Sequence, residues 1–272
     1  MQARGVALVT GASRGLGRAT ALELARRGFE VVASMRDPSV GEELLDRARQ
    51  DGLLLRVERL DVERPGSIRM PDGLRVLVNN AGADSRHLPL EESELAEWRR
   101  LFETNVFGLV ETTRRAIPAL RASGGGVVCN VTSASLLFPM PFFAAYRASK
   151  AAVSAIGETL RAELAPFGIR VVEILPGPID TDMLAASKRV PEAAEFEAYK
   201  VLAERAHAGR LAVESDVTPP EAAARRIADA ILDDAAPLRS ACDALGQGLL
   251  EGWRQAGDED WMRGLLAGSG MG

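Results

Sequence analysis

Short apolar runs alternate with segments of helical periodicity along most of the chain. An apolar run bounded by glycine or polar positions predicts a strand that is buried on both faces. Such runs occupy residues 6–10, 29–34, 53–60, 74–78, 126–131 and 168–175, and a shorter one lies at 238–242. Helical spacing separates them at 19–25, 41–50, 91–120, 146–167 and 221–233. This alternation predicts an α/β fold with an open parallel sheet.

The pattern weakens after residue 181. Residues 182–219 are rich in alanine and glutamate and predict one or two loose helices. A connection of this length is typical of a lid or a binding loop. Terminal helices are expected at 243–253 and 259–266. Because no repeat or domain boundary interrupts the pattern, we expect a single domain over residues 1–272, with a helical C-terminal extension at 243–272.

Composition and charge narrow the class of protein. The 272 residues are 47% apolar and 26% charged, and the net charge of −5 gives no sign of nucleic-acid binding. No apolar run is long enough to span a bilayer. Cys129 and Cys242 fit no metal-binding spacing, and His87 and His207 are isolated, so no metal site is expected. We therefore expect a soluble protein of the reducing cytoplasm.

A glycine-rich turn follows the first predicted strand. Gly11, Gly15 and Gly17 lie between that strand and the first helix. Glycines permit a tight turn and close backbone approach, and a helix N-terminus offers free N–H groups to a phosphate. The alternative is a plain strand–helix turn. We interpret the segment as a dinucleotide phosphate cradle.

The end of the second predicted strand indicates which dinucleotide is bound. An acid at this place would bind the ribose 2′-hydroxyl of NAD, but the strand runs into Met35 and Arg36. Arg36, together with Arg14 of the glycine turn, could pair with the 2′-phosphate of NADP. Asp37 is the competing feature, because a slightly different loop would turn it toward a 2′-hydroxyl. We expect NADP(H), with NAD(H) as the alternative.

Polar residues follow several other strands at one edge of the predicted sheet. Asp61 could meet an adenine amino group, or it could cap a turn. The segment from Asn79 to Gly82 suits a crowded strand end beside a ligand, or a turn. Ser133 ends the fifth strand. Ligands of open parallel sheets bind beyond the carboxyl ends of the strands, so this convergence predicts the site.

Tyr146 and Lys150 are spaced to lie side by side on one helix face. A cation beside a phenol favours the phenolate and so lowers the pKa of the phenol. The chain contains only three lysines but thirty arginines, so lysine is the rarer choice of cation. Lysine can shift its pKa where arginine stays protonated, so its use here suggests proton transfer. The alternative is an ordinary surface pair. Asn105 interrupts the helical run 91–120 and indicates a kink, or a locally bonded side chain.

These motifs resemble the short-chain dehydrogenase/reductase family. The resemblance covers residues 5–181, and more loosely residues up to 242. It implies a three-layer α/β/α Rossmann fold with a doubly wound, mostly seven-stranded parallel sheet. Residues 182–218 would be the family's variable substrate-binding segment. The motifs are Thr10-Gly-Ala-Ser-Arg-Gly-Leu-Gly17, Asn79-Asn-Ala-Gly82, Asn105, Ser133, Tyr146-x-x-x-Lys150 and Pro176-Gly177 with Thr181.

The resemblance also implies roles for these residues. Tyr146 would be the acid/base, and Lys150 would lower its pKa and hold the nicotinamide ribose. Ser133 would bind the substrate oxygen, and Asn105 would keep the helix kinked around a water that links Lys150 to solvent. The implied cofactor-binding residues are Gly11, Ser13, Arg14, Gly15, Leu16, Gly17, Arg36, Asp61, Val62, Asn79, Ala81, Gly82, Tyr146, Lys150, Pro176, Gly177, Ile179 and Thr181.

The implied reaction interconverts a carbonyl and a secondary or primary alcohol by hydride transfer. Apolar residues around the predicted pocket favour a lipophilic substrate such as a steroid, retinoid or ketone, with contacts from Ser135, Phe138, Phe143 and Met183. One alternative is a 3-oxoacyl carrier-protein reductase that docks its acidic carrier on the Arg86–His87 turn. Another is a non-catalytic cofactor-binding regulator. The resemblance also suggests a homodimer or homotetramer.

Overall fold

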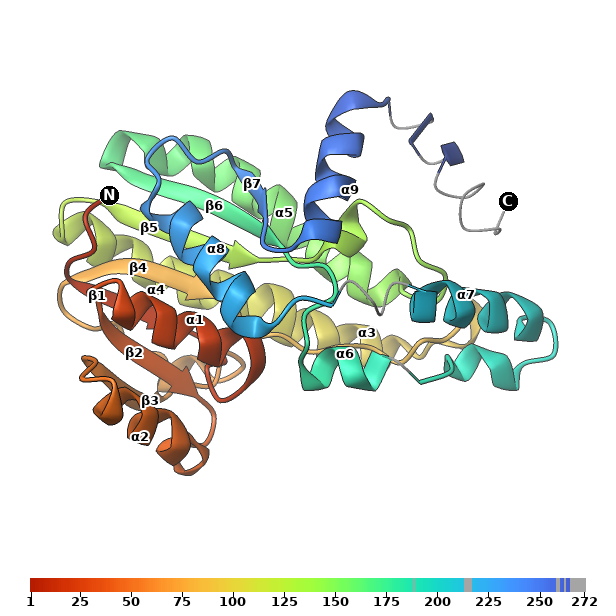
Figure 1. The fold of residues 1–272 in the computed structure, drawn as a ribbon, viewed down its shortest axis with the longest axis horizontal. Helices are drawn as coiled ribbons and strands as arrows, with labels where there is room; N and C mark the ends of the chain where they lie inside the picture. The colour runs from red at the N-terminus through yellow and green to blue at the C-terminus, as the bar shows by residue number, and fades with distance from the viewer. Residues whose placement is uncertain (188, 213–216, 258–259, 262, 265–272) are drawn as a thin grey trace.

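The computed structural model describes residues 1–187, 189–212, 217–257, 260–261 and 263–264 (Figure 1). Its centre is a parallel sheet of seven strands in the order β3-β2-β1-β4-β5-β6-β7, which confirms the predicted fold class. Each strand lies within about two residues of its predicted position. The strands are β1 Val6–Val9, β2 Glu30–Met35, β3 Leu55–Arg59, β4 Leu74–Asn79, β5 Gly126–Val131, β6 Ile169–Leu175 and β7 Arg239–Ala241.

Helices cover both faces of the sheet (Figure 1). One apolar core joins the sheet to α1, α2 and α8, and a second core joins its other face to α4 and α5. The predicted three layers are therefore present. The helices are α1 Gly15–Arg26, α2 Glu42–Gln50, α3 Leu95–Phe102, α4 Gly108–Ala122, α5 Ala144–Leu164, α6 Asp182–Ser187, α7 Lys200–Ala212, α8 Pro220–Leu232 and α9 Ala244–Gln255.

The apolar runs of the sequence are continuous because the central strands are buried on both sides. In β1, Ala7 and Val9 belong to the core under α1 and α8, whereas Val6 and Leu8 belong to the core under α4 and α5. Successive side chains of a strand point to opposite faces. A strand with helices on both faces therefore needs apolar residues at every position.

The segment after β6 builds the far end of the molecule. Figure 1 shows α6, α7 and α9 beyond the carboxyl ends of the strands. Within the predicted loose segment 182–219, α6 and α7 are separated by a short 3₁₀ helix at Glu192–Glu195. The predicted helix at 259–266 falls largely outside the described residues. Among those residues, no helix is both long enough and apolar enough to cross a membrane.

Candidate active site

The turn between β1 and α1 needs glycine at each of its three positions. Gly11 and Gly15 have φ angles of 65° and 55°, in the left-handed region that disfavours other residues. A Cβ on Gly11 would lie 2.8 Å from Cα of Ala81, and one on Gly17 would overlap the Asn80 amide. The turn is thus packed directly against the strand end that follows β4.

Asn80 braces this turn from the neighbouring strand end. Its Nδ2 donates hydrogen bonds to the carbonyls of Thr10 and Gly11, at 2.9 and 3.1 Å. The Thr10 hydroxyl accepts in return from the backbone N–H groups of Asn80 and Ala81, both at 3.0 Å. This bracing holds the glycine turn in front of the N-terminus of α1. Since the first N–H groups of a helix lack intrahelical partners, the arrangement suits a dinucleotide phosphate.

The same turn meets the segment after β6. A Cβ on Gly15 would lie 3.1 Å from Cγ2 of Thr181, so this predicted cofactor residue does approach the glycine turn. Gly177 donates its backbone N–H to Asp243 at 2.7 Å. Arg14 is exposed and pairs with the exposed Asp182 at 3.1 Å. Exposed pairs of this kind contribute little to stability, and the Arg14 side chain can exchange partners readily.

An arginine and an aspartate follow β2, and only the aspartate is hydrogen-bonded within the described chain. Asp37 accepts hydrogen bonds from the backbone N–H and the hydroxyl of Ser39, at 3.0 and 2.8 Å. These bonds lower the pKa of Asp37, and they engage the carboxylate in capping the 3₁₀ helix Pro38–Gly41. Arg36 is exposed, and within the described part of the chain its guanidinium has no hydrogen bond or ion pair.

Two of the other predicted strand-end residues are engaged by the protein itself. Asp61 accepts from the backbone N–H of Glu63 at 3.1 Å and lies 3.5 Å from Arg64, which is the turn-capping alternative. The amide of Asn79 is buried and donates to Thr113 and Asn130, at 2.8 and 2.9 Å. Its side chain is therefore part of the core. The sequence analysis assigned Asn79 to the cofactor site and did not single out Asn80, whose side chain contacts the glycine turn, although side-chain alternation along the strand could have separated the two.

Tyr146, Lys150 and Ser133 come together at the start of α5. Tyr146 and Lys150 are buried on one face of the helix, and the Lys150 Nζ lies 5.7 Å from the centre of the phenol ring. The Ser133 side chain lies beside the Tyr146 hydroxyl, where it acts to lower the pKa of the phenol. Lys150 Nζ donates to the carbonyl of Val131 at 3.0 Å, which anchors the lysine to the end of β5.

Burial dominates the acid–base properties of this pair. It raises the pKa of Tyr146 above its usual value, with a further rise from the Asp84 charge, and Ser133 opposes the rise. Burial also lowers the pKa of Lys150 to about 8, against the charges of Asp84 and Glu173. The expected lowering of the Tyr146 pKa is therefore absent from the protein chain alone, because desolvation of the phenolate outweighs the other effects.

Asn105 lies in a π-helical turn at Glu103–Phe107, where the sequence predicted a break in the helix. Its Oδ1 accepts from the N–H of Ala83 at 2.8 Å, and its Nδ2 donates to the Ala83 carbonyl and to Ser149, both at 3.0 Å. A Cβ on Gly82 would lie 3.4 Å from Asn105 Oδ1 and 3.6 Å from Lys150 Nζ. Gly82 thus keeps open the space between the two predicted catalytic residues. π-turns of this kind are frequent at functional sites.

The loop between β5 and α5 supplies the predicted substrate contacts. Phe143 is buried; its ring stacks on His87 with 4.0 Å between ring centres and meets Tyr146 edge-on at 6.3 Å. The Ser135 hydroxyl is buried and has no hydrogen-bond partner within the described chain. Met183, on α6, is 43% exposed. Phe138 is half-buried.

Two long side chains fix this loop. Arg147, on α5, donates to the carbonyls of Ser135 and Leu136, at 2.9 and 3.0 Å. The Trp261 indole donates to the carbonyl of Leu137 at 2.8 Å. Leu137 itself packs on Leu175 and Leu250, so it belongs to the core and not to the pocket rim.

The loop also contains an unusual backbone conformation. Phe142 has a φ of 69° and is the only non-glycine residue with positive φ in the described chain. Its ring meets Tyr199, just before α7, edge-on at 6.1 Å. The conformation thus sits two residues before the start of the helix that carries Tyr146.

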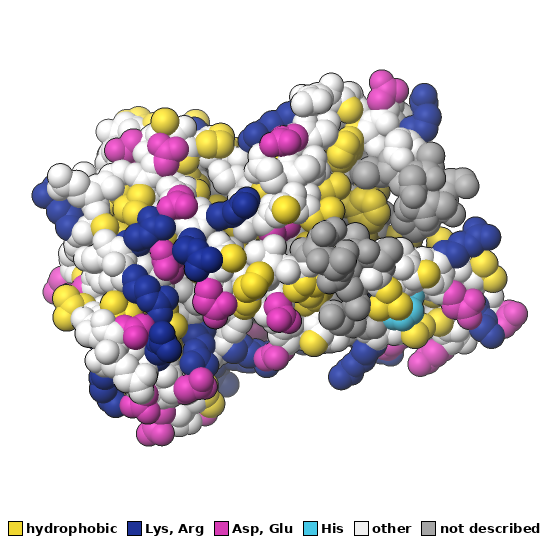
Figure 2. Space-filling model, in the orientation of Figure 1, with side chains coloured by type: hydrophobic (Ala, Val, Ile, Leu, Met, Phe, Trp, Pro, Cys, Tyr) yellow, Lys and Arg dark blue, Asp and Glu magenta, His cyan; other side chains and the backbone are white. Residues whose placement is uncertain are grey.

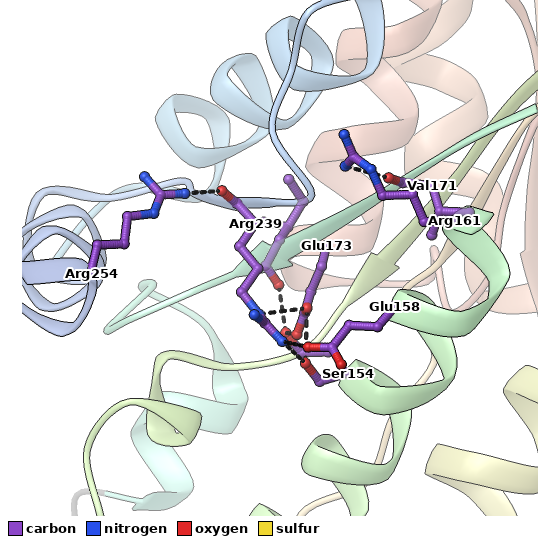
Figure 3. Close-up of polar contacts among 9 residues, drawn as sticks. Ser154, Glu158, Arg161, Val171, Glu173, Arg239 and Arg254 are labelled. Carbon is purple, nitrogen blue, oxygen red and sulfur yellow. Dashed lines mark hydrogen bonds and ion pairs between the residues drawn. The ribbon is translucent and has the colours of Figure 1, made fainter. Parts of the chain in front are cut away.

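A buried carboxylate of β6, Glu173, is hydrogen-bonded to the side of α5 that faces the sheet (Figure 3). Glu173, in β6, is 1% exposed and accepts hydrogen bonds from Thr132, Ser154 and Arg239, at 2.9, 3.0 and 3.2 Å. Burial raises the pKa of Glu173 despite these partners. Arg239 also pairs with Glu158 of α5. The network ties β5, β6 and β7 to the helix of the acid/base pair, and no sequence motif indicated it.

Comparison with known proteins identifies the family. The family model for short chain dehydrogenases matches residues 5–192. The chain belongs to the short-chain dehydrogenase/reductase family. It is therefore an oxidoreductase that acts on alcohol and carbonyl groups.

Similar proteins extend the comparison. The chain is 36% identical over 191 residues to the uncharacterized oxidoreductase YusZ of Bacillus subtilis, covering 67% of this chain and 68% of that protein. It is 34% identical over 196 residues to 3beta-hydroxysteroid dehydrogenase 1 of Eggerthella lenta, covering 68% and 75%.

Solved structures of this dehydrogenase/reductase family match along nearly the whole chain. A short-chain dehydrogenase from Streptomyces avermitilis aligns with a TM-score of 0.77 at 31% identity, covering 97% of this chain and 96% of that one. A short chain dehydrogenase from Burkholderia cenocepacia, solved in complex with NADP, aligns with a TM-score of 0.74 at 29% identity, covering 98% and 99%.

Proposed function

We propose that this protein is an NADP(H)-dependent oxidoreductase that interconverts a lipophilic carbonyl compound and its alcohol. The observation that carries the proposal is the meeting of Tyr146, Ser133 and Lys150 at the carboxyl end of β5. The glycine turn at the end of β1 lies at the same edge of the sheet. A bound NADPH would supply a hydride to the carbonyl carbon, and NADP⁺ would accept it in the reverse direction.

The protein chain supplies the proton and holds the oxygen. In reduction, the Tyr146 hydroxyl gives its proton to the carbonyl oxygen as the hydride arrives at the carbon, so an alcohol is formed. The raised pKa of Tyr146 favours the neutral phenol, which is the form that carries the proton to be donated. Ser133 donates a hydrogen bond to the oxygen as negative charge develops there. Lys150 and Asn105 face each other across Gly82, and this arrangement supports a route that returns a proton to Tyr146.

NADP(H) is favoured over NAD(H) by the residues after β2. Arg36 is exposed and has its donors available within the described chain, whereas Asp37 is engaged by Ser39. A planar guanidinium is well suited to a phosphate. The NADP complex of the similar Burkholderia cenocepacia protein is consistent with this choice.

A lipophilic substrate is supported by the surface near the site. Figure 2 shows hydrophobic side chains in a hollow between α9 and α7. Phe143 and Met140 pack in the same cluster as Tyr146, so apolar groups approach the acid/base directly. The 3beta-hydroxysteroid dehydrogenase among the similar proteins is named for a substrate of this type. A 3-oxoacyl carrier-protein reductase is less favoured, because Arg86 pairs with Glu192 and His87 is buried, so the turn offers no free basic patch.

The chain also carries features of a homodimer or homotetramer. Phe107, next to α4, is 56% exposed, and Val110 is 38% exposed. Ala155 and Ile156 line a shallow apolar hollow on α5. Large exposed apolar side chains on packed helices favour association of copies. Cys129 and Cys242 are buried free thiols, which agrees with a place in the reducing cytoplasm.

The proposal is tested by NADPH oxidation with a panel of neutral ketones, aldehydes and quinones, with NADH in parallel. Tyr146→Phe removes the proton donor and keeps the ring, so we expect turnover to fall by about 10²–10⁴-fold. NADPH binding, measured by fluorescence titration, should be retained. Unchanged turnover in Tyr146→Phe would reject the assignment of the acid/base.

A further inference from the structure

An arginine of α7 lies beside the aromatic ring that contacts Tyr146. The Arg210 guanidinium carbon is 4.7 Å from the centre of the Phe143 ring. The edge of the same ring system meets Tyr146 at 6.3 Å between centres. Arg210 is half-buried in this position. A permanent positive charge is thus one aromatic ring away from the proposed acid/base.

This guanidinium has donors without acceptors. Within the described chain, Arg210 makes no hydrogen bond and no ion pair. Arginine carries five N–H donors, and a half-buried guanidinium without an acceptor in the described chain can offer them to a ligand. Burial accordingly lowers the pKa of Arg210, against the charge of Asp84. By contrast, Arg86 pairs with Glu192 and Arg14 pairs with Asp182.

Further polar groups around Phe143 lack partners as well. The Nε2 of His87 and the hydroxyl of Ser135 are both buried, and neither has a hydrogen-bond partner in the described residues. His87 stacks on the same Phe143 ring. His207 lies one turn before Arg210 on α7, and its Nδ1 is also buried without a hydrogen-bond partner in the described residues. Buried polar groups in proteins are normally hydrogen-bonded, so these groups are available to bind a ligand.

Asp84 does not supply that partner. Its Oδ1 accepts from the backbone N–H of Ser85 at 2.8 Å, and its Oδ2 lies 3.7 Å from His87 Nε2, beyond hydrogen-bond distance. No ion pair joins Asp84 to Arg210 within the described part of the molecule. The Arg210 donors are therefore available to a ligand that brings its own negative oxygens.

We propose that the substrate carries a carboxylate, which Arg210 binds while its carbonyl or hydroxyl group reaches Tyr146. His87 and Ser135, whose buried polar atoms have no partner in the described chain, are the candidates for the rest of that contact. The substrate class is then an oxo acid or hydroxy acid with an apolar body, whose ring or chain lies against Phe143. This inference rests on the proposed function, since it specifies the substrate of the same site.

The test uses two probes that share one chain and differ in the end group, a charged carboxylate in one and a neutral amide in the other. Decanoate and decanamide have the same chain length, and neither can be reduced by hydride at a ketone. Binding of each to the NADP⁺-loaded enzyme is measured by calorimetry. A charge-assisted hydrogen bond is worth about 1.5–3 kcal/mol, so we expect decanoate to bind about 10- to 100-fold more tightly than decanamide.

Variants on α7 assign the preference to one residue. Arg210→Met should reduce the ratio of the two affinities to about twofold or less, and Arg210→Lys should retain part of it because the charge remains. Arg205→Met is the matched control on the same helix, where the side chain is exposed, and it should keep the full ratio. Equal affinity for the two probes, binding of neither probe, or a preference that survives in Arg210→Met would overturn the inference.

The outcome is separable from the proposed function. Turnover of neutral ketones with NADPH tests the oxidoreductase assignment without any carboxylate. If ketones are reduced but decanoate shows no Arg210-dependent preference, only the carboxylate site is rejected. If the preference is found and no carbonyl compound is reduced, the proposed function fails and the anion site stands.

Discussion

At the scale of single residues, burial sets the chemistry of the site. It raises the pKa of Tyr146 and lowers that of Lys150 to about 8, so it favours the neutral form of both side chains. A neutral phenol can give a proton to a substrate oxygen. A lysine with a pKa near 8 can exchange protons with water at physiological pH. Burial thus brings the pKa of Lys150 closer to the working pH, whereas it moves the pKa of Tyr146 away from it.

Arg36 is the residue on which the cofactor preference depends. Arg36→Asp replaces a cation by an anion where the 2′-phosphate is expected, so NADPH affinity should fall by about 10- to 100-fold or more. NADH lacks this phosphate, and its affinity should change by less than about threefold. Fluorescence titration with each nucleotide measures both.

The control for this change is Arg49→Asp, on the exposed surface of α2, which should leave both affinities within about twofold of the wild-type values. Equal losses for NADPH and NADH in Arg36→Asp would remove Arg36 from the phosphate site.

The sequence predicted some residues of the site and not others, for a physical reason. Tyr146, Lys150 and Ser133 were found because a helix and a strand end fix their relative positions locally. Arg210 reaches the site only through the path of the chain after β6, which no local pattern specifies. Glu173 was hidden inside an apolar strand, where a single acid gives no periodic signal.

At the scale of elements, Glu173 makes the support of α5 sensitive to pH. Its pKa is raised by burial above the usual carboxyl value of 4.5, so the folded protein binds this proton more tightly than the unfolded chain. The stabilising contribution of the protonated form is complete below that usual value. It is lost as the pH rises through the folded-state pKa.

Glu173→Gln removes this titration and keeps the shape of the side chain. We expect the stability of the wild type relative to Glu173→Gln to decline as the pH is raised from 4.5 through the folded-state pKa. Urea unfolding of both proteins over a series of pH values measures the difference. A difference that is independent of pH, or that grows in favour of the wild type, would contradict the raised pKa. Glu158→Gln, at the exposed end of the network, serves as the control.

The strands of the sheet were predicted more accurately than the helices that lie beyond the strand ends. The central strands are buried on both faces, so their sequences are apolar throughout and bounded by glycine or polar residues. The segment 182–219 lacks this constraint, because α6 and α7 lie beyond the strand ends (Figure 1). The sequence predicted helices in this segment, but it could not predict where they begin and end.

At the scale of the whole molecule, Asp243 connects the C-terminal part to the cofactor side of the sheet. This buried carboxylate caps α9 through the N–H of Gly246 and holds the N–H of Gly177, both at 2.7 Å. It therefore joins β7, α9 and the loop of the predicted cofactor-binding residue Gly177. One side chain couples the stability of the C-terminal helix to the position of that loop.

Asp243→Ala should lower the free energy of unfolding by about 2–4 kcal/mol, because two charge-assisted hydrogen bonds are lost in a buried place. It should also raise the KM for NADPH, since the Gly177 loop is no longer held. Urea unfolding and steady-state kinetics measure the two effects. Asp233→Ala removes an exposed carboxylate that accepts from Ala235 and should cost less than about 1 kcal/mol. Equal costs for the two variants would show that Asp243 has no special coupling role.

The left-handed backbone of Phe142 has a mechanical consequence. A non-glycine residue in this region costs on the order of 1–3 kcal/mol, and the cost persists only where the surroundings enforce it. Here the ring is held against Tyr199, at the start of α7, while Arg147 fixes the loop on the other side. The loop between β5 and α5 therefore holds a strained backbone conformation between α7 and the helix that carries Tyr146. The contact between Phe142 and Tyr199 is thus one of the interactions that hold this strained backbone in place.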